Sequence, residues 1–313
     1  MLPLTRIKNP IVWQELSHQH RATTRRLSRL RLLAPILVCL MFVGVALTLS
    51  NIDYPTRELG ICAIYLVHIL TALRALDAGA NAISREHANQ TWDALILTGV
   101  NARQILFGKW RAILEHVAPW MVMLGALRLA MIPVFLVALT NYYGSIVLSY
   151  GSYYANSNTY GGVPPVDVSW VPWSTCLAVV MTVILTMLDV MCCTAIGLAA
   201  SALTRRTVSA MVVAVMVRFT PVILMAAMTR FDLGAEAANS YRVLRYAPFA
   251  LADGGTAPLS RLSVPLSPIS MTTHVDALGG LFISTLLIIA LLVVSLNIAW
   301  IAIRRAGALP AAR

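Results

Sequence analysis

The sequence predicts an all-α integral membrane protein with six transmembrane helices. Of its 313 residues, 58% are apolar and 12% are charged, about half of the charged fraction that is typical of a soluble domain. The apolar residues gather in six runs of the length that a bilayer-spanning helix needs, about 20 residues. These two observations exclude a water-soluble enzyme, a disordered chain and a nucleic-acid-binding protein, although the net charge is +11.

The six runs organise the whole chain, residues 1–313, as a single transmembrane domain. The predicted spans cover residues 32–50, 59–80, 109–139, 174–200, 208–228 and 277–303. The first and the last contain no charged residue. The intramembrane charges of interest in the other spans are Arg74, Asp77, Arg128, Asp189 and Arg218.

The distribution of basic residues predicts the orientation of the spans. An even number of spans places both termini on one side, and that side carries sixteen Lys and Arg residues against five on the other. Because loops rich in Lys and Arg stay in the cytoplasm, both termini are predicted to be cytoplasmic, in a multi-pass protein of the cytoplasmic (plasma) membrane.

Two segments between spans are predicted to lie on the outer side. Residues 141–173 are rich in Tyr and Trp, which gather at the depth of the lipid headgroups, so we expect an interface-hugging segment there. Residues 230–276 contain the short apolar stretch 246–252, which is too short to span the membrane. A re-entrant or interfacial helix is the prediction for this stretch.

Residues 1–31 are predicted to form a cytoplasmic amphipathic helix in the membrane interface. Asn9 and Pro10 suit the first positions of a helix, Glu15 lies near its start, and several arginines follow. The alternative is a solvated basic tail.

The connection between the second and third spans predicts a short cytoplasmic helix. Trp92, Leu95 and Ile96 recur at helical spacing, and Asp93 lies early, where its charge suits the helix dipole. Gly99 fits the position just after a helix, and the segment from Asn101 to Gln104 is a capping box for the next one. The helix exposes apolar side chains, so either a partner protein covers them or they pack on the chain's own spans.

The stretch ISREHANQTWDALILTGVNARQILFGKW, residues 83–110, resembles the coupling-helix region of ABC-2-type transporter permeases. NPIVWQEL, residues 9–16, resembles the N-terminal connecting helix of that family. IGLAASALTRRTVSAM, residues 196–211, resembles its turn between the fourth and fifth spans. The three matches occur in the expected order and on the expected side.

The resemblance implies the membrane-spanning permease subunit of an ATP-driven exporter. Two such subunits, identical or different, would form the pathway, and two separate ATPase subunits would drive it. The residues expected to contact the ATPase are Glu86, Trp92, Asp93, Leu95 and Leu97, with Glu15 nearby on the N-terminal helix. The cargo stays open.

The residues themselves agree with a subunit that is not an enzyme. Gly108 and Lys109 are followed by Trp110 rather than by the Ser or Thr of a phosphate-binding loop, so ATP is expected on the partner subunit and no cofactor on this chain. His68 and His116 lie in apolar helices and are interpreted as core residues with satisfied hydrogen bonds. The alternatives that we keep are a membrane-embedded enzyme of lipid metabolism and an ion-driven secondary transporter.

The intramembrane charges are predicted to pair. The turn between the fourth and fifth spans is short, and Asp189 and Arg218 lie at equal distances from its centre, so we expect an ion pair between them. Arg74 and Asp77, three residues apart on the second span, are expected to pair in the same way. The Asp189–Arg218 pair is interpreted as a structural bridge, with recognition of an anionic cargo by Arg218 as the alternative.

Overall fold

The structure of the chain is a computed structural model. It describes residues 54–92, 100–156, 171–204, 206–230, 251–252 and 271–308, with side chains over 64–92, 100–129, most of 176–227, 251–252 and 279–306. The predicted N-terminal helix with Glu15 and the predicted first span lie outside the described residues.

Five long helices form the described part of the chain, which contains no strand. They are α3 (Tyr54–Ala88), α5 (Ala102–Asn156), α6 (Val171–Leu203), α7 (Thr207–Arg230) and α11 (Met271–Ala308). Each contains a segment long and apolar enough to cross a membrane. The described part is therefore all-helical and compatible with a multi-pass membrane protein, while a sixth span remains a prediction.

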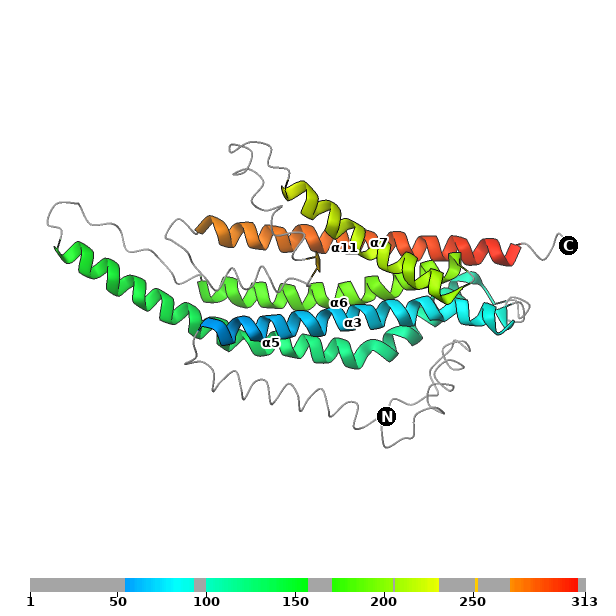
Figure 1. Cartoon of the computed structure of the whole chain (residues 1–313), viewed down its shortest axis with the longest axis horizontal. Helices are drawn as coiled ribbons and strands as arrows, with labels where there is room; N and C mark the ends of the chain where they lie inside the picture. Colours follow the sequence, from blue (N-terminus) through cyan, green and yellow to red (C-terminus); the bar gives the residue numbers. More distant parts are fainter. Residues whose placement is uncertain are drawn as a thin grey trace, which may run out of the picture.

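Helix α6 lies at the centre of the bundle and contacts α3, α5, α7 and α11. In Figure 1 the end of α3, the start of α5, the turn from α6 to α7 and the end of α11 all lie at the same end of the bundle, which we call the α3–α5 end. Residues 192–201 of α6 are buried at every position. This segment consists mainly of small residues, which allow helix backbones to approach closely within a membrane.

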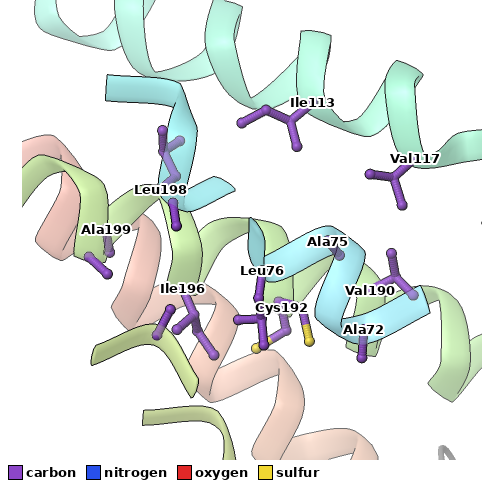
Figure 2. Close-up of a cluster of buried hydrophobic side chains, with 14 of the residues drawn as sticks. Ala72, Ala75, Leu76, Ile113, Val117, Val190, Cys192, Ile196, Leu198 and Ala199 are labelled. Carbon is purple, nitrogen blue, oxygen red and sulfur yellow. The ribbon is translucent and has the colours of Figure 1, made fainter. Parts of the chain in front are cut away.

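The closest helix contact joins α3 and α6 at Gly79 and Gly197. A Cβ atom added to Gly79 would lie 2.5 Å from the carbonyl oxygen of Thr194, and one added to Gly197 would lie 2.5 Å from that of Leu76. Figure 2 shows part of the apolar packing near this contact, where side chains of α3, α5 and α6 meet. Because backbone atoms fill the space, only glycine fits at either position.

Hydroxyl groups add polar contacts near the glycines. Ser201 Oγ accepts hydrogen bonds from the backbone N–H groups of Ile83 and Ser84, at 2.9 and 2.7 Å. Trp110 Nε1 of α5 donates a hydrogen bond to Thr194 Oγ1 of α6 at 3.0 Å. These bonds tie α3 and α5 to the central helix.

Helix α3 extends further than predicted. The prediction ended the second span near residue 80, but the helix continues through the polar segment to Ala88. Residues 83 and 84 are buried against α6, so this part of the helix is covered by protein. The turn after the helix contains Gln90, which has a φ of 57°, and the N–H of Thr91 donates to the carbonyl of Glu86 at 3.0 Å.

Helix α5 is also longer than predicted. The expected capping box is confirmed, because Asn101 Oδ1 accepts from the N–H of Arg103 at 3.2 Å and Gln104 Oε1 from the N–H of Asn101 at 3.4 Å. The helix then runs without interruption to Asn156, beyond the other described helices in Figure 1. Residues 141–156, the first part of the predicted interface-hugging segment, therefore continue the helix of the third span.

Candidate functional site

The candidate functional site is a network of buried charged and polar side chains on four helices. Its centre is Asp189 of α6, whose side chain is completely buried. Oδ1 of Asp189 lies 2.6 Å from a terminal guanidinium nitrogen of Arg218 in α7, and Oδ2 lies 3.1 Å from Nε2 of His68 in α3. The predicted Asp189–Arg218 ion pair is therefore present. Both carboxylate oxygens are engaged, by groups from two different helices.

Arg218 also holds a backbone group from the segment before α11. The same terminal nitrogen donates to the carbonyl oxygen of Leu251 at 2.5 Å, and the Leu251 side chain is completely buried. Leu251 and Ala252 are helical, and they are the described residues of the apolar stretch 246–252. A backbone carbonyl inside a transmembrane bundle needs a donor from the protein, which Arg218 supplies here.

His68 connects Asp189 to Arg128 of α5. Its Nδ1 lies 3.4 Å from a terminal nitrogen of Arg128, and both side chains are 1% exposed. A guanidinium group has only donors, so Nδ1 must accept and Nε2 must carry the proton that it donates to Asp189. The contacts thus assign the neutral Nε2–H tautomer to His68.

This network contains three of the five predicted intramembrane charges and adds one residue. Arg128, Asp189 and Arg218 are brought together, with His68 between the first two. The interpretation of His68 as a core histidine with satisfied hydrogen bonds is confirmed, but its ionic partners were missed. The available signal was that His68 lies within an apolar span, as Arg128 does.

The predicted pairing of Arg74 with Asp77 is wrong. Both side chains are exposed on α3, and the ion pairs of the described residues do not include one between them. Asp77 Oδ1 instead accepts from Asn81 Nδ2 at 2.8 Å. Asn81 lies four residues after Asp77 on the same helix face, so its amide, rather than the longer Arg74 side chain, binds the carboxylate.

The connection after α3 differs from the prediction in one important residue. Trp92 is only 4% exposed and its ring lies 5.0 Å from that of His87, so the expectation of an exposed tryptophan is wrong. Glu86 is partly exposed and forms an ion pair with Lys109 at 3.1 Å. Asp93, Leu95 and Leu97 lie outside the described residues.

We predict that glutamine replaces His68 better than leucine does. The Gln amide can donate to Asp189 and accept from Arg128, whereas leucine removes both contacts and should lower the free energy of unfolding by about 1–3 kcal/mol. Unfolding in mixed detergent–SDS micelles measures both variants. A glutamine variant no more stable than the leucine variant would contradict the assigned tautomer.

Within the part of the chain that the structure describes, no group of three His, Cys, Asp or Glu residues is arranged to hold a metal ion. The arrangement instead suits two tasks, joining four helices through ion pairs and hydrogen bonds and keeping a protonatable group beside a carboxylate inside the bundle. No protein-family model, curated protein or solved structure matches the chain.

Proposed function

We propose that the chain is the membrane-spanning permease subunit of an ATP-driven ABC transporter, an exporter that is powered by a separate ATPase subunit and has no catalytic activity of its own. It would pair with a second permease subunit, identical or different, with both termini in the cytoplasm. Five membrane-length helices and the resemblance of residues 83–110 to ABC-2-type permeases support this proposal.

The observation that carries the proposal is the ion pair between Glu86 and Lys109. Glu86 belongs to the ISRE start of the resembling stretch and Lys109 to its Gly-Lys end. The two side chains meet at 3.1 Å although 23 residues separate them, and the Lys109 side chain is 2% exposed. The two ends of the stretch are thus joined by a partly buried contact, which a solvated loop would not have.

This closure gives the connection a mechanical role in the proposal. Glu86 lies at the end of α3 and Lys109 near the start of α5, so their contact holds the two helix ends together. A partner that pushes on the connection would move both helices as one body. In this proposal the buried Trp92 side chain holds the connection against the bundle, and the partly exposed Glu86 lies at the surface of the connection.

The proposal is tested by looking for an ABC-type ATPase gene beside the gene of this chain and co-expressing its product with the full chain. We expect a stable complex that hydrolyses ATP in proteoliposomes, with a rate that depends on the permease. A monodisperse chain that transports without ATP, or one that never associates with the ATPase, would overturn it.

We predict that Glu86→Gln reduces the permease-dependent part of the ATPase rate severalfold while the complex still assembles. The substitution removes the carboxylate that faces the buried Lys109 ammonium, so the two helix ends lose their ionic contact. The matched control is the exposed pair Arg111–Glu115 of α5, at 3.0 Å, where Glu115→Gln should change little. Equal effects of the two substitutions would count against a coupling role for Glu86.

One observation favours a second candidate, an ion-driven secondary transporter. His68 and Asp189 form a buried contact between transmembrane helices, and such His and carboxylate groups serve as proton relays in transporters. The two candidates separate in proteoliposomes that contain the chain alone. Transport driven by a pH gradient without ATP, and abolished by His68→Gln, would favour this second function.

A further inference from the structure

The α3–α5 end of the bundle carries a cluster of cations around one tryptophan. The guanidinium carbon of Arg103, at the start of α5, lies 5.5 Å from the centre of the Trp300 ring, and that of Arg304 in α11 lies 5.6 Å from it. Both arginines are exposed, and neither forms an ion pair within the described part of the chain. Two positive charges therefore converge here with no carboxylate paired to either of them among the described residues.

The start of α5 adds to the positive potential at this place. Arg103 lies in the first turn of α5, where the unpaired N–H groups of a helix carry a partial positive charge. A cation at that position is unfavourable unless an anion compensates it. A guanidinium group that contacts an aromatic ring with one face still presents its N–H groups along the edge, in the geometry that binds phosphate.

Exposed apolar side chains lie one helical turn deeper in the bundle than each arginine. Phe107 follows Arg103 by four residues on α5 and is 51% exposed, while Ile301 precedes Arg304 by three on α11 and is 43% exposed. Residues at these spacings share a helix face. Since α5 starts and α11 ends here, both helices present a cation at the rim and an apolar group below it.

We propose that Arg103, Trp300 and Arg304 form a binding site for the phosphate headgroup of an anionic phospholipid, whose acyl chains lie along Phe107 and Ile301. The order of charge, aromatic ring and apolar side chain along both helices matches the order of headgroup, interface and hydrocarbon in a bilayer. An acidic protein surface would match the charges but would leave the apolar side chains below them uncovered.

The test uses the full chain in detergent, titrated with phosphatidylglycerol or phosphatidylcholine and read by native mass spectrometry. We expect wild type to prefer phosphatidylglycerol, and Arg103→Gln with Arg304→Gln to weaken that binding about 30-fold, since each basic residue near a lipid surface contributes about fivefold. The double lysine variant keeps the charges and should keep the preference. Arg111→Gln, at an exposed arginine paired with Glu115, is the matched control.

Several results would overturn the proposal. These are equal binding of the two lipids, an unchanged affinity in the double glutamine variant, or the same loss in Arg111→Gln. Competition by equimolar glycerol phosphate would indicate a site for free phosphate, and binding of polyglutamate without a lipid preference would indicate an acidic protein partner. Each single glutamine variant should lose about fivefold, which keeps the test valid if the double variant fails to fold.

Discussion

Replacing Arg218 by leucine is expected to lower the free energy of unfolding by about 3–5 kcal/mol, the usual cost of removing one partner of a buried ion pair. Asp189 would lose its cationic partner while keeping its contacts with His68 and the Cys193 thiol, and the Leu251 carbonyl would lose its donor. Unfolding in mixed detergent–SDS micelles measures the loss. Asp189→Asn should cost a similar amount, because its single amide oxygen can accept from Arg218 or from His68 but not from both, and the Arg218 charge stays buried without a carboxylate.

The double variant Asp189→Asn with Arg218→Gln distinguishes a true pair from two independent residues. We expect the loss of stability in the double variant to be smaller than the sum of the two single losses. Each single variant leaves the partner's charge unpaired, whereas the double variant removes both charges. The exposed Arg111–Glu115 pair, treated in the same way, should be additive within about 0.5 kcal/mol. Additive losses at 189 and 218 would contradict the ion pair.

Exchanging the two charges should rescue less than neutralising both. An arginine at 189 would direct its N–H groups at the Nε2–H of His68, and an aspartate at 218 would direct its oxygens at the Leu251 carbonyl. Both new contacts are repulsive. Full recovery of stability in the exchanged variant would contradict this expectation. It would show that the contacts with His68 and with the Leu251 carbonyl contribute little.

The second large effect is expected at the contact between α3 and α6, where Gly197→Ala should cost about 2–3 kcal/mol. In most helix positions this substitution stabilises by about 1 kcal/mol, because alanine favours the helix. Here the new Cβ would lie 2.5 Å from the Leu76 carbonyl oxygen and 2.9 Å from the Ala80 nitrogen. These are backbone atoms, so no change of rotamer relieves the clash and the helices must separate.

Gly125 provides the matched control for this substitution. A Cβ added there would lie 3.7 Å from side-chain atoms of Val183 and Met187, which is an ordinary contact. Gly125→Ala should therefore be neutral or slightly stabilising in the same unfolding measurement. If Gly197→Ala and Gly125→Ala behave alike, the close approach of α3 and α6 is wrong.

The sequence predicted the charge pair but only part of its network, for a geometric reason. The turn between α6 and α7 is short, so it fixes these helices as neighbours and places Asp189 and Arg218 at similar depth. Nothing comparable links α3 and α5 to α6. His68 reaches Asp189 because the glycine contact sets the position of α3, and a single glycine in an apolar span does not reveal its partner. Arg128 joins the network through His68.

The connection after α3 shows a second reason why prediction failed. Helical spacing identified Trp92 as part of an apolar face, but spacing does not say what covers that face. The structure covers Trp92 with the chain itself, against His87. Likewise, the spacing of Arg74 and Asp77 allowed a pair, but Asn81 offers Asp77 a closer hydrogen bond. Residue spacing identifies possible contacts, but which contact forms depends on the other side chains that are close enough to compete for it.

The distribution of the network over four helices also sets an order for its assembly during synthesis. The ribosome releases α3 and α5 first, so His68 and Arg128 reach the membrane before Asp189 exists. A charged residue at the centre of a lone helix costs about 2.5–3.5 kcal/mol at insertion. Because Asp189 and Arg218 emerge within one short hairpin, they can enter the bilayer as a neutralised pair, and the arrival of α6 then gives His68 the carboxylate that completes the chain of charges.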